Sequence, residues 1–170
     1  MNRKLNSRIA FLGIVVLIAA CTVFFFIHEM NSPGFKFYYP DQYYKNLKYE
    51  KRYINLNNRK REEKYSLLIK EYILGPLQND LMNPLPEKVS LVDVWWVNDF
   101  KKEAIVINLT ADFEKFAMSG NERVLWFIKG LKETINKNTG IKKIYLLSDN
   151  KKVKAKVGDF NLSYPIIVKK

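Results

Sequence analysis

Three carboxylates beside apolar sequence are the side chains of this chain best suited to acid–base chemistry: Asp93, Asp112 and Glu114. Two carboxylates held a few ångströms apart can act as general acid and base, as in the hydrolysis of glycosidic bonds. However, Asp112 follows Thr110 in an expected turn, and Glu114 is expected to face solvent. Asp93 falls on the less buried side of an expected strand. The sequence therefore favours solvated carboxylates over a catalytic pair.

Histidine and cysteine, which often supply bases, nucleophiles and metal ligands, occur once each, as His28 and Cys21. Both lie in or beside an apolar N-terminal run. The sequence contains no Gly-rich phosphate loop and no His-Glu-x-x-His motif. We therefore expect no catalytic residue, no metal site, no cofactor and no enzymatic activity.

Exposed aromatic side chains are better candidates for a functional surface. Four tyrosines cluster early in the chain, and Trp95-Trp96 places one indole on each face of an expected strand. Aromatic surface residues suit protein interfaces, sugar stacking and lipid headgroups. The predicted interaction surface consists of Tyr38, Tyr39, Tyr43, Tyr44 and Trp95. The alternative is that these side chains pack in the core or at a bilayer surface.

Residues 9–27 form an uncharged apolar run. At a helical rise of about 1.5 Å per residue the run reaches roughly 28 Å, close to the ~30 Å hydrocarbon core of a bilayer. Arg3, Lys4 and Arg8 precede the run, and Glu29 follows it. By the positive-inside rule, the N-terminus stays in the cytoplasm and the rest of the chain is exported.

This topology divides the chain into four segments. We expect a cytoplasmic basic flank over 1–8, a transmembrane signal anchor over 9–27, a linker over 28–34 and a domain over 35–170. The protein is then a single-pass protein of the cytoplasmic membrane, with its domain on the periplasmic or extracellular face.

Cys21 supports a second form of attachment. Ile18-Ala19-Ala20-Cys21 resembles a bacterial lipobox, in which the cysteine is lipidated and becomes the mature N-terminus. Apolar sequence continues over 22–27, where a lipoprotein normally begins a polar tether. The signal anchor is therefore the first prediction and lipidation of Cys21 the alternative.

The chain is basic, with 29 Lys and Arg against 17 Asp and Glu and a net charge of +12. The balance stays positive when Arg3, Lys4 and Arg8 are left out. Anionic wall polymers or lipid headgroups are conceivable partners of such a surface. Outside the cytoplasmic membrane, we expect no nucleic acid partner.

The first half of the domain predicts two strands and a helix. Aromatic and alternating residues indicate strands over 35–39 and 47–56. Apolar residues then recur with helical spacing over 60–74, and Gly75-Pro76 ends the pattern.

The second half repeats this order. Strands are predicted over 89–97 and 104–109 with a hairpin loop between them, and residues 112–116 form a turn or a single helical turn. Ser119 and Glu122 resemble a capping box that opens a helix over 121–138. A strand over 141–147 and an exposed edge strand over 153–157 complete the domain.

The order ββαββαβ(β) predicts an α+β fold. In this fold a mixed or antiparallel sheet carries two amphipathic helices on one face, and an N-terminal transmembrane helix precedes it.

The order and spacing of several motifs resemble a GerMN domain, named after a sporulation and germination protein of spore-forming bacteria. The motifs run from about residue 35 to 158. In the first half they are a helix that ends at Leu74-Gly75-Pro76 and a Pro-containing loop before a hydrophobic strand. In the second half they are Val106-Ile107-Asn108-Leu109-Thr110 followed by Phe113, then Ser119-Gly120 with Glu122, then Leu131-Lys132-Glu133-Thr134, and finally Ile141 to Leu146.

The resemblance implies an interaction or assembly module. Proteins with this domain are typically exported lipoproteins or membrane-anchored proteins. We therefore expect a membrane-anchored, non-enzymatic protein-interaction element of the bacterial cell envelope. The alternative is a module that binds cell-wall glycan, and a wall-modifying enzyme ranks third.

Overall fold

The computed structural model describes residues 13–24, 34–56, 58–99 and 102–168. The chain divides into two compact units, Met1–Gly34 and Phe35–Lys170. In the first unit, residues 13–24 form a helix. None of the helices in the described part of the chain combines the length and apolar character that crossing a membrane requires. The remaining residues of the predicted span, 9–12 and 25–27, lie outside the described residues, so the anchor stays a prediction.

The second unit begins with a β-hairpin formed by β1 (Phe35–Pro40) and β2 (Leu47–Arg52). The Asp41 carboxylate fixes its turn, because Oδ1 accepts the N–H groups of Tyr43 (3.2 Å) and Lys45 (2.9 Å). Both predicted strands are confirmed, although the second is shorter than expected. They form a separate two-stranded sheet instead of joining the main one, which corrects the expected single sheet.

Helix α2 (Arg61–Ile73) confirms the predicted helix over 60–74. Glu62 and Glu63 lie in its first turn, where the helix dipole favours negative charge. Gly75 follows with φ of +91°, a left-handed conformation that glycine adopts without steric cost. The structure therefore confirms that Gly75-Pro76 ends the helix.

The central sheet contains β3 (Leu91–Asp99), β4 (Lys102–Leu109), β5 (Lys143–Ser148) and β6 (Lys151–Lys152), in that order. β3 and β4 are antiparallel, as the predicted hairpin requires, whereas β4 and β5 are parallel. The sheet is therefore mixed.

Short strands complete the unit: β9 (Ile166–Ile167) pairs with β5, and β7 (Lys156–Val157) pairs with β8 (Phe160–Asn161). The continuous edge strand expected over 153–157 is wrong, because β6 and β7 are separate. Val153 and Ala155 are buried. That segment leaves the sheet to cover part of the core.

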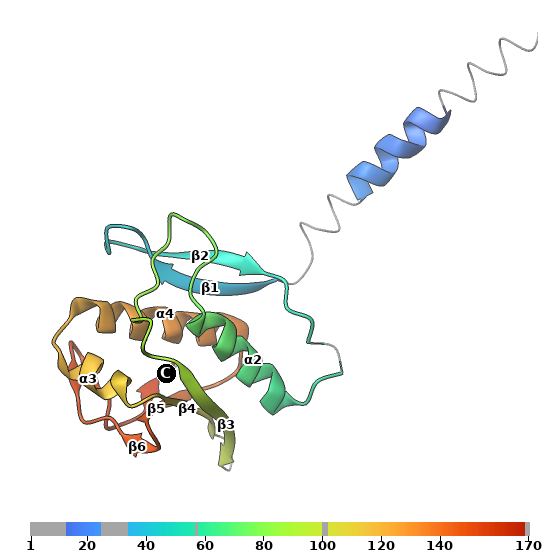
Figure 1. The fold of residues 1–170 in the computed structure, drawn as a ribbon. Coiled ribbons are helices and arrows are strands. Elements are labelled where there is room, and N and C mark those ends of the chain that lie inside the picture. Colours follow the sequence, from blue (N-terminus) through green and yellow to red (C-terminus); the bar gives the residue numbers. More distant parts are fainter. Residues whose placement is uncertain (1–12, 25–33, 57, 100–101, 169–170) are drawn as a thin grey trace, which may run out of the picture. The chain divides into compact units, whose positions relative to one another are not determined.

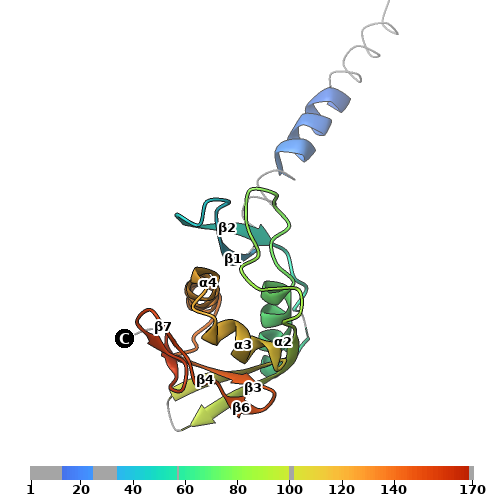
Figure 2. The same ribbon diagram turned by 60° about the vertical axis from the view of Figure 1, so that its left-hand side comes forward.

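Helices α3 (Asp112–Met118) and α4 (Glu122–Asn138) join α2 on one face of the sheet (Figures 1 and 2). The prediction of two helices missed α3, which was expected as a single turn at most. The capping box was also wrong. Ser119 ends α3, whereas Asn121 caps α4 by accepting the Arg123 N–H at 2.9 Å. The predicted helix over 121–138 is confirmed.

The helices lie between the central sheet and the β1–β2 hairpin (Figure 2). The largest fully buried side chains come from all three layers, and include Phe37, Tyr39, Tyr72, Ile107, Phe113 and Phe127. Burial of this apolar area, at about 25 cal/mol per Å², is the main force that holds the layers together.

The outer edge of β1 is covered by α4. The Lys36 N–H donates to Asn138 Oδ1 and the Tyr38 N–H donates to Thr134 Oγ1, both at 2.9 Å. Gly130 permits this approach, because a Cβ there would collide with the Tyr38 carbonyl oxygen. Helical side chains thus take the place of a further strand.

Candidate functional site

The face of the central sheet that points away from the helices is the first candidate site. Across β3, β4 and β5 the register aligns Trp95 with Val106 and Tyr145, so these side chains share one face. Val97 and Ile167 extend the same face through the next register row. We call these five residues the open face.

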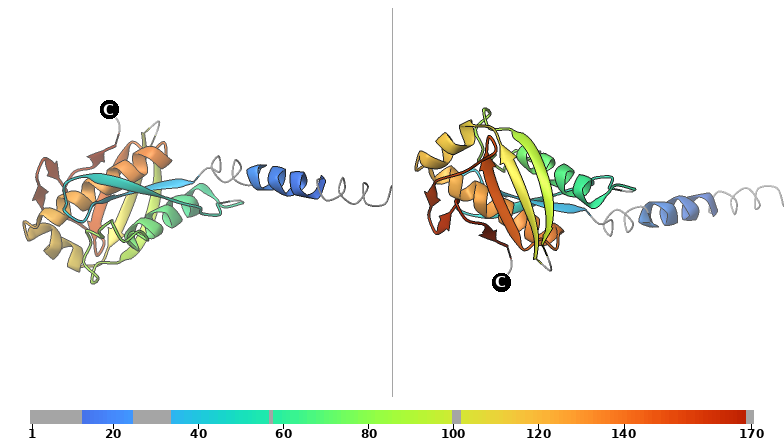
Figure 3. Two further views of the ribbon diagram at one scale, coloured as in Figure 1. Left: turned by 90° about the horizontal axis from the view of Figure 1, so that it is seen from above. Right: turned by 90° about the horizontal axis from the view of Figure 1, so that it is seen from below.

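The open face is apolar and accessible. Trp95 is 39% exposed, Val97 42% and Ile167 45%, while Val106 and Tyr145 are half-buried. Seen from below, the sheet lies in front and the helices lie behind it (Figure 3). Within the described residues, no helix covers this side.

Charged groups lie beside and within the open face. Asp93 falls on the same side of β3 as Trp95, and Lys143 lies in the row of Val97, between Ala104 and Ile167. The centre holds aromatic and aliphatic side chains and no carboxylate. Such a surface can bind a partner but offers no group for proton transfer.

The three candidate carboxylates do not form a catalytic pair. Asp93 is exposed on β3. Asp112, in the first turn of α3, lies 3.6 Å from the Lys115 ammonium. Glu114 accepts the Lys154 N–H at 3.5 Å. No hydrogen bond joins two of these carboxylates in the described ranges, and no cluster there could hold a metal ion.

The early tyrosines do not form one surface. Tyr43 is 76% exposed, and the Lys45 ammonium lies 5.9 Å from the centre of its ring. Tyr44 is half-buried, and its ring centre lies 6.4 Å from that of Trp126. The ring centre of Tyr38 lies 5.5 Å from that of Tyr49. Each therefore belongs to a different local contact.

Tyr39 corrects the prediction, because it is fully buried. Its ring stacks on Tyr72 at 5.1 Å, and its hydroxyl donates to the Tyr72 carbonyl oxygen at 2.8 Å. Burial raises the pKa of this phenol well above its ordinary value of 10.0, although the neighbouring Arg52 opposes the shift. The strand alternation placed Tyr39 on the face that packs against α2.

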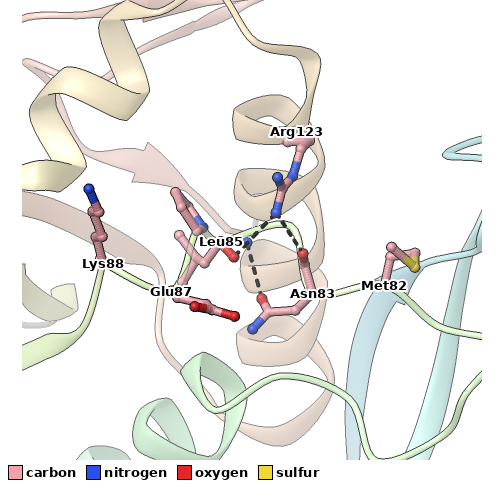
Figure 4. A pocket seen from close by; sticks show the side chains of 7 residues that line it. Met82, Asn83, Leu85, Glu87, Lys88 and Arg123 are labelled. Atoms are coloured by element: carbon pink, nitrogen blue, oxygen red, sulfur yellow. Dashed lines mark hydrogen bonds between the residues drawn. The ribbon is translucent and has the colours of Figure 1, made fainter.

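A surface cavity of about 640 Å³ forms the second candidate site, between the loop of residues 82–88 and the start of α4 (Figure 4). Arg123 Nη2 donates to the carbonyl oxygens of Asn83 (3.1 Å) and Leu85 (3.3 Å). Asn83 Oδ1 accepts the Leu85 N–H at 3.0 Å. Arg123 therefore clamps this loop through Nη2, whereas its Nε is buried without a hydrogen-bond partner in the described part of the chain.

The sequence pointed to Trp95 but missed its neighbours Val106, Tyr145 and Ile167. Strand parity contained the signal for the first two, because Val106 and Tyr145 alternate with buried residues of β4 and β5. The contribution of Ile167 had no sequence signal, since β9 is only two residues long.

Comparison with known proteins supports a family assignment. The model of the Germane family, described as sporulation and spore germination, matches residues 36–154. No curated protein matches the chain. A solved structure of a candidate lipoprotein from Clostridium perfringens is 26% identical, covering 78% of this chain and 85% of that chain with a TM-score of 0.49. The family match spans well over half of the sequence and confirms the GerMN resemblance. The chain therefore belongs to the Germane family.

Proposed function

We propose that the chain is a non-enzymatic binding module of the bacterial cell envelope, tethered to the membrane, which docks a partner protein on the open face. The observation that carries this proposal is the exposed row centred on Trp95. Membership of a sporulation and germination family supports the envelope setting. The apolar run over 9–27 supports the tether.

The chemistry of the open face favours a protein over a glycan. An apolar patch bordered by charged residues is typical of protein interfaces, whereas sugar sites combine an aromatic floor with carboxylate or amide walls. The Arg123 cavity offers no such floor, because its described lining contains no aromatic residue. A wall glycan is therefore the second candidate, and an enzyme the third.

The proposal is tested by placing a photo-crosslinking residue at Val97 of the full chain in living cells. We expect an adduct that protease digests. Met118, which is 62% exposed on α3, is the matched control position and should give no such adduct. An adduct at Val97 that only a muramidase degrades would favour the glycan, and recovery of lipid alone would favour a membrane surface. Either result contradicts the protein proposal.

The absence of catalysis is a separate part of the proposal. It is supported by the separate positions of Asp93, which is exposed, and of Asp112 and Glu114, which are half-buried and contact Lys115 and Lys154. Saturable turnover of a wall substrate that is lost in Asp112→Ala would overturn it.

The tether itself takes one of two forms, a signal anchor or a lipidated Cys21. Mass spectrometry of the mature protein separates them. An intact N-terminus that is insensitive to globomycin supports the anchor. Loss of the first 20 residues together with a gain of acyl mass, abolished in Cys21→Ala, supports the lipoprotein.

A further inference from the structure

Strand β3 leaves one edge without a partner. Within the described residues β3 pairs only with β4. The Val94 N–H donates to Asp93 Oδ1 at 2.7 Å, so this amide points away from β4. Because amide directions alternate along an antiparallel strand, the N–H and C=O groups of Trp96 and Asn98 point to the same free edge. No other element of the described chain bonds to them.

The edges of β1, β2 and β6 are protected. β1 is covered by Asn138 and Thr134 of α4. β2 carries Lys48 and Lys51, and β6 consists of two lysines. Lysine on an edge strand discourages pairing with another chain.

From Val94 to Asn98, β3 has neither lysine nor hydrogen-bonded cover. Helix α2 packs against β3, but no hydrogen bond within the described residues joins α2 to the amides of Trp96 or Asn98. This segment contains no lysine, proline or glycine, and its residues Val-Trp-Trp-Val favour extended structure. A bulge between Leu91 and Asp93 ends the regular edge on one side. The unpaired edge is therefore short and largely apolar.

The two faces beside this edge differ in chemistry. On the open face, a strand added to β3 would lie beside Trp95 and Val97. On the helix face it would lie beside Trp96, where the Arg61 guanidinium sits 5.2 Å from the ring centre. Arg61 is more than half exposed, although it also pairs with Glu103 at 2.7 Å. Apolar residues suit the first face and acidic residues the second.

Charge favours one of the two kinds of chain that could add a strand to β3, a second copy of this protein or an acidic segment of another protein. A second copy of this chain brings the same net charge of +12 and is repelled, whereas an acidic segment is attracted.

We propose that Val94–Asn98 is a docking edge for an extended segment of the partner protein in which acidic and apolar residues alternate, and which joins the sheet as an additional strand. The proposal rests on the proposed function and specifies its mode. Main-chain hydrogen bonds supply affinity in this mode, and the alternating side chains supply specificity.

The test uses a capped nine-residue peptide of alternating Glu and Val, and a matched peptide with Lys in place of Glu. Binding to the full chain in mild detergent is measured by fluorescence anisotropy. We expect the Glu peptide to bind at least about ten-fold more tightly and to slow amide exchange of Trp96 and Asn98.

Asn98→Pro removes one edge donor, and Asn98→Ala is the matched control that keeps it. Loss of a hydrogen bond predicts affinity about ten-fold weaker for the proline variant, with little change for alanine. Equal binding of both peptides, or of both variants, overturns the docking edge. So does self-association through β3 without peptide binding.

Crosslinking distinguishes failure of this mode from failure of the function. A protein adduct at Val97 that persists in Asn98→Pro rejects the docking edge and leaves the proposed function standing. The absence of any protein adduct in the unmodified chain rejects the function itself.

Discussion

The outer edges of β1 and β3 both present unpaired backbone N–H and C=O groups to their surroundings, but only the edge of β1 finds hydrogen-bond partners. On β1, the outward N–H groups of Lys36 and Tyr38 donate to side chains of α4. On β3, the outward groups of Trp96 and Asn98 have no partner in the described chain. The difference shows that a helix with polar side chains at the right spacing can satisfy the hydrogen bonds of a strand edge in place of another strand. Helix α2 packs against β3 without supplying such hydrogen bonds, so that edge stays unpaired.

The largest expected effect comes from blocking the approach of α4 to β1. In Gly130→Ala the new methyl group would collide with the Tyr38 carbonyl oxygen and lie 2.6 Å from the Tyr72 hydroxyl. We expect the free energy of unfolding to fall by about 3 kcal/mol, measured by urea denaturation in mild detergent. Gly140→Ala, where only Glu103 Oε2 comes within 4 Å, should be nearly neutral.

The next effect comes from removing the acceptor that covers β1. Thr134→Val keeps the shape of a fully buried side chain but leaves the Tyr38 N–H unpaired. We expect a loss of about 2 kcal/mol in the free energy of unfolding. The matched control is Thr110→Val, because Thr110 Oγ accepts the Ser90 N–H in an exposed position. Equal losses in the two variants would mean that the hydrogen bond from β1 to α4 stabilises the fold no more than an exposed hydrogen bond does.

A direct comparison places proline at an outward amide of each edge. Lys36→Pro removes the donor to Asn138 and should lower the free energy of unfolding by about 1 kcal/mol. Asn98→Pro removes an amide without a partner and should change it by less than about 0.5 kcal/mol. Thermal denaturation of the two variants checks the order. A reversed order would contradict the assignment of the open edge to β3.

The smallest effect concerns the turn that aligns β1 with β2. Hydrogen bonds to its carboxylate hold the pKa of Asp41 below its ordinary value of 3.8, and the bond from the Lys45 N–H has the largest effect. A lowered folded-state pKa stabilises the fold above the unfolded-state pKa, and that stability is lost as pH falls through the folded-state pKa. We therefore expect the free energy of unfolding to fall more steeply below about pH 4 in the natural chain than in Asp41→Asn. Parallel pH profiles would contradict this role.

Local sequence patterns predicted most of the elements. The helical spacing before Gly75-Pro76 indicated α2 within a residue at each end, and alternation identified the strands of the central sheet. These signals work because a helix end and a strand face depend on neighbours that are close in sequence.

The site was harder to predict. Trp95 is partly exposed, but Tyr39, which was predicted for the interaction surface together with its neighbour Tyr38, is fully buried. The chain alternates equally well with either face inward, so parity alone does not say which side of a hairpin meets α2.

By itself, the sequence determined the basic charge, the apolar run over 9–27, the element order and the Germane family, because these depend on residue types and their spacing along the chain. Only the tertiary structure decided that β1–β2 forms its own sheet, that α4 covers one edge, and that β3 keeps the other edge free. Those outcomes depend on contacts such as Lys36 with Asn138, between residues a hundred positions apart. Such contacts form only when the whole domain packs, and no local pattern encodes them.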